Sequence, residues 1–464
     1  MIGSISKPVL APAFCAANKI IISNSAADTI TFGLVNFADT VLKERIKKAY
    51  HKYRCVFREM DQKEFSLKIS QLFSVDEGQN ITSENSGGEN GRSAIEMIDT
   101  IADNAPAVNL LNSIFLEALS ARASDIHIES GGGGAAIQYR IDGLLIHAGT
   151  ISAERAAAVS ARLKVIANLN VLENRRPQDG HIEINTDDYS LDVRISIVPT
   201  IQGESIVLRL LNRSDIPLNP DSLGFSQQHS AFIKNIPGIS SGLILVTGPT
   251  GSGKTTTLAA ILGELNNGSR KIISIEDPVE YRIEGITQIQ VHEELDLTFE
   301  TILRRIFRQD PDIIMIGEIR DIVTAELAVR AALTGHLVFA TLHTNNAAEA
   351  LCRLQNMGIQ SYMAAAVLRA IIAQRLIRKI CKSCKGSGCA GCSRTGYSGR
   401  TAVAEIIAVD EKLRNIIAAG GDTVQLKTYL AETNFKTLFD DAEEKLKAGI
   451  TAAEEIRREL GARA

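Results

Sequence analysis

Residues 248–255, GPTGSGKT, have the types and the spacing that bind nucleotide phosphates. They fit the pattern G-x-x-x-x-G-K-[ST] and lie between an apolar run, LILVT, and a helix-like run, TTTLAAILGEL. Glycines free backbone N–H groups to surround phosphate oxygens at a helix N-terminus, Lys254 supplies a positive charge, and Thr255 supplies a hydroxyl ligand for Mg2+. The alternative is a glycine-rich turn that matches by chance. The predicted ATP contacts are Gly248, Pro249, Thr250, Gly251, Ser252, Gly253, Lys254, Thr255 and Thr256.

Acidic residues follow two other apolar runs and could complete a hydrolytic site. The run DIIMIGE ends in Glu318, a carboxylate that could meet Mg2+ directly or through water. Its alternative role is a surface ion pair with Arg320. The stretch IEDPVEY carries Glu276, Asp277 and Glu280, one of which could orient the attacking water. A capping or turn cluster before a proline is the competing interpretation.

Four cysteines lie within residues 381–392, CKSCKGSGCAGC, whereas the rest of the chain holds three, Cys15, Cys55 and Cys352. Tetrahedral zinc, with Zn–S distances of about 2.3 Å, needs sulfur atoms within roughly 4 Å of one another. The four residues between the two pairs span at most about 14 Å, and their glycines relax the turn. We therefore predict structural Zn2+; a redox pair, a disulfide or a site that has lost its geometry are the alternatives. The ligands would be Cys381, Cys384, Cys389 and Cys392.

Basic residues near the cysteines, Arg375, Arg378, Lys379, Lys382 and Lys385, are expected to help keep the thiolates deprotonated. They could also bind phosphate groups or nucleic acid. Because aromatic residues do not alternate with them, a solvated face is the favoured interpretation.

The segments around these motifs predict three domains. Residues 1–75 have the strand and helix patterns of a small α/β unit, and residues 76–93 have the composition of a flexible linker. Helical stripes and alternating strands over 94–213 predict an α+β domain. From 214 to 464, short continuous apolar runs predict parallel strands buried on both faces, with polar-rich helices at the end.

Composition limits the class of protein. The chain has 464 residues, is 45% hydrophobic and carries a net charge of −4, so no overall positive field draws it to nucleic acid. No run approaches the roughly 18 apolar residues of a membrane-spanning helix. We expect a cytoplasmic protein, in which structural disulfides are disfavoured.

From residue 104 onward the sequence resembles the ATPases of type II secretion and type IV pilus assembly. Eight blocks in the same order carry the resemblance: ASDIHIE, YRIDG, RPQDG, GPTGSGKT, IEDPVEY, LRRIFRQDPDIIMIGEIRD, TGHLVFATLHTN and GYSGRTAVAE. It implies a PAS-like domain followed by a RecA-like ATPase domain. It also implies a homo-hexamer that uses Mg2+ and ATP to drive pilin-like subunits out of the inner membrane.

The resemblance also implies roles for single residues. Glu280 would polarise water, Glu318 would belong to the Walker B motif, and Arg194 and Arg209 would reach the phosphates from the preceding domain. Histidines of the family's histidine box would act as sensors, although His343 could equally be a core histidine. The resemblance also singles out other positions. They are the histidines His336 and His343, the acidic residues Asp310 and Asp312, and the candidate nucleotide or interface arginines Arg304, Arg308 and Arg400.

Several functions fit this family pattern. The first is a motor for assembly of pili or pseudopili, recruited to the inner membrane by a platform protein and an adaptor, without direct nucleic-acid binding. A retraction motor, which typically lacks the four cysteines, and a hexameric nucleic-acid translocase of conjugation are the alternatives. A nucleotide-binding scaffold without turnover is disfavoured by Lys254, Glu280 and Glu318. The sequence departs from the family pattern in two places: residues 1–75 form a shorter unit than many relatives carry, which bears on docking to the platform protein, and only KGSG separates the cysteine pairs, where relatives commonly have tens of residues.

Overall fold

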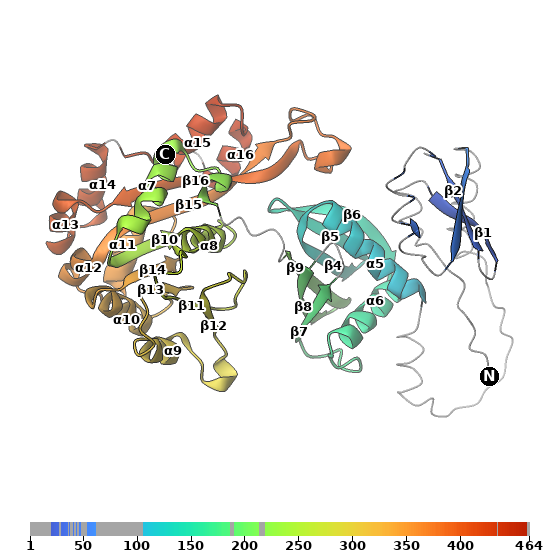
Figure 1. Cartoon of the computed structure of the whole chain (residues 1–464), viewed down its shortest axis with the longest axis horizontal. Coiled ribbons are helices and arrows are strands. Elements are labelled where there is room, and N and C mark those ends of the chain that lie inside the picture. Colours follow the sequence, from blue (N-terminus) through green and yellow to red (C-terminus); the bar gives the residue numbers. More distant parts are fainter. Residues whose placement is uncertain are drawn as a thin grey trace. The chain divides into compact units, whose positions relative to one another are not determined.

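A computed structural model of the chain describes residues 105–185, 190–212, 219–433 and 435–461, together with parts of 20–61. It divides into two compact units, residues 1–117 and 118–464 (Figure 1). The linker predicted over 76–93 lies outside the described residues, as do most of residues 38–53, which carry the helix pattern of the predicted N-terminal unit.

The first unit contains a three-stranded sheet formed by β1 (Ile20–Ala26), β2 (Thr29–Leu34) and β3 (Arg54–Glu59). Strand β2 pairs antiparallel with β1 and parallel with β3. Alternate residues of β2, including Ile30 and Phe32, are buried, and the Phe32 ring stacks on Phe57. The strands expected in the N-terminal unit are therefore present. Helix α5 (Ala105–Ser120) runs across the boundary between the units.

The second unit begins with a six-stranded antiparallel sheet in the order β6-β5-β4-β9-β8-β7. Apolar side chains such as Ile126 and Val193 are buried on one face, where α6 (Ala153–Ile166) contacts β4, β5 and β9. The other face carries Asp125, Arg194 and Arg209, so the alternating sequence pattern is that of a half-buried sheet. The strands are β4 (Ala123–Gly131), β5 (Gly134–Ile141), β6 (Leu144–Ser152), β7 (Gln178–Asn185), β8 (Ser190–Thr200) and β9 (Gly203–Asn212).

A seven-stranded sheet follows, in the order β12-β11-β13-β14-β10-β15-β16. All neighbouring strands are parallel except the last pair, which is antiparallel. Every residue of β10, β11, β13 and β14 is buried, as the continuous apolar runs predicted. The strands are β10 (Gly242–Thr247), β11 (Ile272–Glu276), β12 (Thr287–Gln290), β13 (Ile313–Ile316), β14 (Leu337–Leu342), β15 (Leu368–Ile380) and β16 (Tyr397–Ala408).

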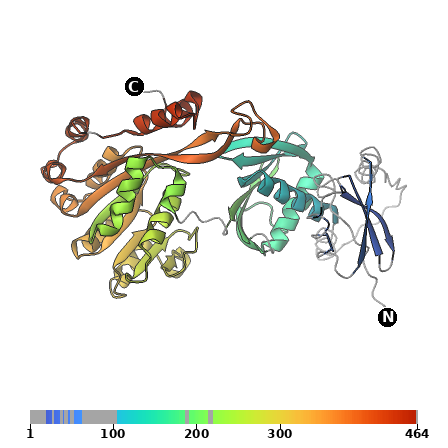
Figure 2. The same cartoon turned by 45° about the horizontal axis from the view of Figure 1, so that its top comes forward.

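Helices cover both faces of this sheet (Figure 2). One face packs against α7 (Gln227–Asn235) and α8 (Lys254–Leu265). The other packs against α9 (Phe299–Ile306), α10 (Ile322–Leu333), α11 (Ala347–Asn356) and α12 (Ser361–Val367). This doubly wound arrangement places the carboxyl ends of the parallel strands, and the loops that follow them, at one edge of the sheet.

Strands β15 and β16 form a long hairpin that the sequence analysis did not predict. The cysteine stretch joins them, and the end of the hairpin projects from the sheet (Figure 1). Arginines interrupt the apolar pattern of β15, although Arg375 and Arg378 are both buried. Their charges are accommodated by specific partners, which a pattern of apolar residues does not reveal.

The C-terminal helices α13 (Glu411–Ala418), α14 (Thr423–Ala431), α15 (Leu438–Lys447) and α16 (Ala453–Leu460) complete the unit. The buried carboxylate of Glu455 in α16 accepts hydrogen bonds from Arg378 Nε at 2.9 Å and from Arg458. Asp441 in α15 accepts from the Ala404 backbone N–H of β16. These buried bonds fasten both helices to the hairpin. Among the described helices, none has the length and apolar character needed to span a bilayer.

Candidate nucleotide site

The phosphate-loop sequence directly follows β10 and ends in the first turn of α8. Gly251 and Gly253 have φ of 78° and 86°, in the left-handed region that favours glycine. Lys254 Nζ donates to the carbonyls of Gly248 and Pro249 at 2.8 and 3.0 Å. The lysine therefore lies folded over its own loop.

The loop fits a phosphate group. A Cβ at Gly248 would come within 2.5 Å of both Ser252 Oγ and the Gln374 carbonyl oxygen, so only glycine allows this close backbone path. The hydroxyl of Ser252 is buried and has no hydrogen-bond partner within the described part of the chain. The N-terminus of α8 has no side-chain cap. Backbone and hydroxyl donors are thus available to an anion.

Burial lowers the pKa of Lys254 to about 8, although the carboxylates of Glu318 and Glu280 act in the opposite direction. The ammonium is removed from water, and no carboxylate in the described part of the chain accepts a hydrogen bond from it. A bound phosphate would supply the missing negative charge.

Glu318 and His343 lie together at the carboxyl ends of β13 and β14. His343 Nε2 is 3.4 Å from Glu318 Oε2, and the other carboxylate oxygen contacts Arg320. Arg320 also approaches Asp277 at 3.4 Å. Burial, and then the charge of Lys254, lower the pKa of His343. The ion pair between Glu318 and Arg320 that was considered from the sequence is therefore present. Glu318 also lies close to the phosphate loop.

The acidic residues after β11 separate into two environments. Glu276 is buried and accepts hydrogen bonds from Ser274 Oγ at 2.6 Å and Gln288 Nε2 at 2.9 Å, and burial raises its pKa. It is fully engaged within the fold. Glu280 instead borders a cavity, and the next residue, Tyr281, contacts Thr256 of α8 through its hydroxyl.

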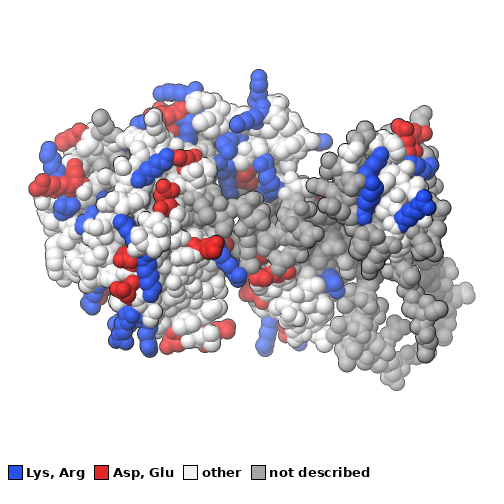
Figure 3. Space-filling view, viewed as in Figure 1, with Lys and Arg blue, Asp and Glu red and all other residues white. Residues whose placement is uncertain are grey.

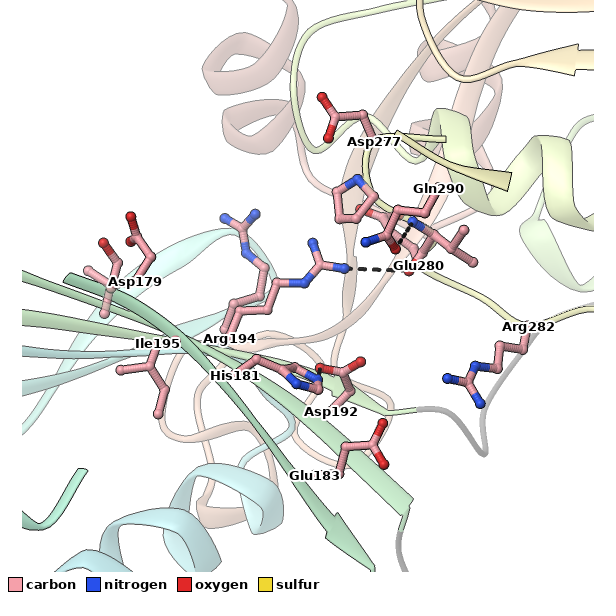
Figure 4. A pocket seen from close by; sticks show the side chains of 16 residues that line it. Asp179, His181, Glu183, Asp192, Arg194, Ile195, Asp277, Glu280, Arg282 and Gln290 are labelled. Carbon is pink, nitrogen blue, oxygen red and sulfur yellow. Dashed lines mark hydrogen bonds and ion pairs between the residues drawn. The ribbon is translucent and has the colours of Figure 1, made fainter. Parts of the chain in front are cut away.

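This cavity, of about 1030 Å³, lies between the 277–282 loop and the polar face of the antiparallel sheet (Figure 4). Arg194 projects into it (Figure 4), with its Nη2 3.4 Å from the Val279 carbonyl oxygen, and Arg209 is also among the residues that line it. Arg209 Nε donates to the buried Asp125 at 2.9 Å. Both arginines thus border the same space as Glu280.

Other candidate residues lie away from this group. His336 precedes β14 and Asp312 precedes β13, so both are at the amino ends of the strands, opposite the phosphate loop. His336 Nδ1 lies 2.9 Å from the Ala331 carbonyl oxygen, and Asp312 accepts from the Lys271 N–H at 2.6 Å. Arg304 pairs with Glu300 in its own helix. Asp310 and Arg308 are exposed beyond that helix.

Arg400 also lies elsewhere. It is exposed at the start of β16, where its Nε is 3.9 Å from Asp142 Oδ1. Among the described residues no hydrogen bond or ion pair joins Arg400 to the phosphate loop.

Comparisons with known proteins agree with this geometry. The family model described as Type II/IV secretion system protein matches residues 100–458. The chain belongs to this family. With its phosphate loop, this member of the Type II/IV secretion family is a P-loop ATPase of mixed α/β fold with a parallel sheet.

Individual relatives within and near the Type II/IV secretion family cover most of the chain. The Type II secretion system protein HxcR of Pseudomonas aeruginosa is 42% identical over 371 residues, 78% of this chain and 79% of that protein. The Type II secretion system ATPase E of Vibrio cholerae is 36% identical over 434 residues, 86% of each chain. The solved structure of the pilus retraction motor PilT with bound ADP has a TM-score of 0.56 and 29% identity, covering 74% of this chain and 95% of that one.

The four cysteines of this family member converge. Their sulfur atoms all lie within 4.8 Å of one another, with closest separations of 3.6, 3.8 and 3.9 Å. Four sulfurs at tetrahedral positions around zinc would be separated by about 3.8 Å. The donor set therefore fits Zn2+. The six described cysteines are free of disulfides, and Cys15 lies outside the described residues.

Backbone donors favour thiolates within the cluster. The Cys389 N–H donates to Cys392 Sγ at 3.2 Å and is the main cause that lowers the pKa of Cys392 to about 6. The neighbouring Cys392 sulfur raises the pKa of Cys389 to about 11. A backbone N–H at Cys384 lowers the pKa of Cys381.

The expectation for the surrounding basic residues was partly wrong. Arg375 donates to the Asn345 carbonyl at 3.0 Å, and Arg378 pairs with Glu455, so neither is available to the thiolates. Lys379, Lys382 and Lys385 are exposed, and blue side chains gather on this projecting part of the surface in Figure 3.

One residue that contacts the phosphate loop was missed by the sequence analysis. Gln374 of β15 donates to the Ser252 carbonyl at 2.7 Å and accepts from Thr257 Oγ1 at 2.8 Å. It lies more than one hundred residues from the loop, and no motif spacing connects the two. Only the pairing of β15 with β10 brings them together.

Proposed function

We propose that the chain is a homo-hexameric ATPase that powers the assembly of type IV pili or type II secretion pseudopili. It would act in the cytoplasm, recruited to the inner membrane by a platform protein and an adaptor. The observation that carries the proposal is the convergence of the phosphate loop, Glu318 and His343 at the carboxyl edge of the parallel sheet.

Each residue has a distinct part in the proposed hydrolysis. Phosphate-loop N–H groups and Lys254 hold the outer phosphates, and Thr255 and Glu318 would hold Mg2+, which neutralises phosphate charge when bound. Glu280 orients the attacking water and accepts its proton. His343, beside Glu318, is suited to respond to the γ-phosphate, whereas the position of His336 supports a role away from the nucleotide.

The cavity supports a contribution from the antiparallel sheet. Arg194 and Arg209 carry planar guanidinium groups that can stabilise charge on a transferring phosphoryl group. In the proposal, residues 94–213 and 214–464 act as two domains, and hydrolysis is complete only when they close on the nucleotide. Arg400, distant from the loop, is proposed to contribute to an interface.

The cysteine cluster is proposed to hold one structural Zn2+ through Cys381, Cys384, Cys389 and Cys392, where the ion would cross-link the end of the hairpin. This element favours an assembly motor, because the resemblance associates its loss with retraction motors. The similarity to the retraction motor PilT keeps retraction as the second candidate. A nucleic-acid translocase is not favoured by the net charge of −4.

The test has a biochemical and a cellular arm. Purified protein should hydrolyse ATP with Mg2+, and Lys254→Ala and Glu318→Gln should each lower turnover at least about tenfold. Unchanged turnover in both variants contradicts the site. Deleting the gene should abolish surface pili or a set of secreted proteins; an increase in surface pili instead identifies retraction.

A further inference from the structure

Strand β15 contacts two loops that border the proposed nucleotide site, the phosphate loop and the loop that follows His343. Its even-numbered residues, such as Ala370 and Ile372, pack in the core beneath α8, whereas Ile371 and Ala373 pack beneath α10 and α11. Successive side chains on a strand point to opposite faces. Gln374 and Arg375 therefore reach different parts of the site from adjacent positions.

Gln374 braces the phosphate loop. It is 1% exposed, and both ends of its amide are used, one by the Ser252 carbonyl and the other by the Thr257 hydroxyl. A Cβ on Gly253 would come within 2.8 Å of its nitrogen, so the glycine permits this approach. The amide thus fixes the loop on both sides of Lys254.

Arg375 braces the loop that follows His343. It is 7% exposed and donates to the Asn345 carbonyl and side-chain oxygens at 3.0 and 3.3 Å, and to the Gln374 carbonyl at 3.2 Å. Within the described residues, no carboxylate forms an ion pair with it. Burying a guanidinium without an ion-paired carboxylate costs free energy, and the hydrogen bonds to these loop oxygens offset part of that cost.

The loop after His343 is also tied directly to the strand that precedes the phosphate loop. The Thr344 N–H donates to Thr247 Oγ1 at 3.0 Å, and the two hydroxyls are 2.7 Å apart. Thr247 is the last residue of β10. The phosphate loop and the loop after His343 are therefore both held in place by β10 and β15.

We propose that Gln374 and Arg375 are paired positioning residues, which transmit closure of the phosphate loop on a nucleoside triphosphate to the loop carrying His343. The inference rests on the proposed ATPase function. Gln374 acts on nucleotide binding, and Arg375 acts on the placement of His343 once the nucleotide is bound.

The test compares Gln374→Leu and Arg375→Gln with Arg369→Gln. Arg369 is a matched control, because it is on the same strand and also donates to backbone carbonyls, those of Ser241 and Ala366, near the amino end of β15. Gln374→Leu should raise the KM for ATP at least about fivefold. Arg375→Gln should lower kcat about tenfold with KM changed less than about threefold, and Arg375→Lys should recover part of the loss. Arg369→Gln should keep both constants.

Hydrogen exchange of residues 343–346 supplies a readout that a purely structural role would not change. A saturating non-hydrolysable ATP analogue should slow exchange there in the wild-type chain and in Arg369→Gln, but not in Gln374→Leu or Arg375→Gln, with folding checked by melting temperature. Equal slowing in all four proteins overturns the inference. If the wild type neither binds nor hydrolyses ATP, the proposed function fails instead.

Discussion

We expect the buried ammonium of Lys254 to make the proposed nucleotide binding sensitive to pH. Its pKa of about 8 is the value without a phosphate partner, because burial disfavours the charged form. Below pH 8 the lysine is charged and ready to bind. Above pH 8 a phosphate must also recruit a proton, so affinity should decrease.

We therefore predict that affinity for a non-hydrolysable ATP analogue weakens about tenfold between pH 7 and pH 9, the effect expected for one proton taken up on binding. Calorimetric titration in buffers of different ionisation heat should detect that proton at pH 9. Lys254→Arg is the control, since arginine stays charged and should remove the pH dependence. A wild-type affinity that does not change with pH contradicts the assignment.

A second residue-scale prediction concerns Glu455. Burial raises the pKa of this carboxyl, but hydrogen bonds from Arg458 and Arg378 outweigh it and lower the pKa to about 2. Glu455→Gln should destabilise the second unit by about 3 kcal/mol, because Arg378 loses its buried partner. Urea unfolding measures the difference, and Glu454→Gln, an exposed neighbour, should have little effect.

The sign of its pH dependence follows from the lowered pKa. The contribution of Glu455 is present above the ordinary value near 4.5 and is lost as pH falls toward 2, since protonation removes the charge. The gap between wild type and Glu455→Gln should narrow over that window. A constant gap means that packing rather than charge causes the loss.

At the scale of elements, the sequence patterns predicted the buried parallel strands but not the hairpin. Strands β10, β11, β13 and β14 are short, mostly apolar runs, and burial on both faces leaves that mark directly in the sequence. Strand β15 contains Gln374, Arg375 and Arg378, each satisfied by a partner far along the chain. Periodicity records burial but not hydrogen-bond partners, so these positions were not predicted. The phosphate loop was found because its residues are contiguous.

The cysteine hairpin provides a prediction at this scale. Purified protein should contain one zinc per subunit, and Cys384→Ser or Cys389→Ser should remove it, because three thiolates bind zinc more weakly than four. Elemental analysis measures the metal. Cys352→Ser is the matched control and should retain it, as Cys352 is not part of the cluster. Protein purified under reducing conditions with no zinc would contradict the assignment.

At the scale of the whole molecule, the proposed site takes residues from both sheets of the second unit. Arg194 and Arg209 come from the antiparallel sheet and border the same cavity as Glu280, which lies in the loop after β11 of the seven-stranded sheet. A site assembled in this way depends on domain position as much as on its own residues. The family resemblance singled out the two arginines, and Glu280 was found just after an apolar run, whereas their joint cavity needed the folded chain.

We predict that ATPase activity per subunit rises with protein concentration as hexamers form, which light scattering can follow.

Arg194→Ala should lower kcat at least about tenfold while leaving the melting temperature near that of the wild type. Arg162→Ala, a change in the same unit outside the cavity lining, is the comparison. Full ATPase activity in a monomer would contradict the proposal that hydrolysis depends on hexamer formation.

The short turn between the cysteine pairs has a practical consequence for labelling. Lys385, Gly386 and Ser387 are exposed. Exposed loop tips tolerate insertions best. A small fluorescent tag placed between Gly386 and Ser387 should therefore report the location of the protein in living cells while leaving the proposed nucleotide site undisturbed.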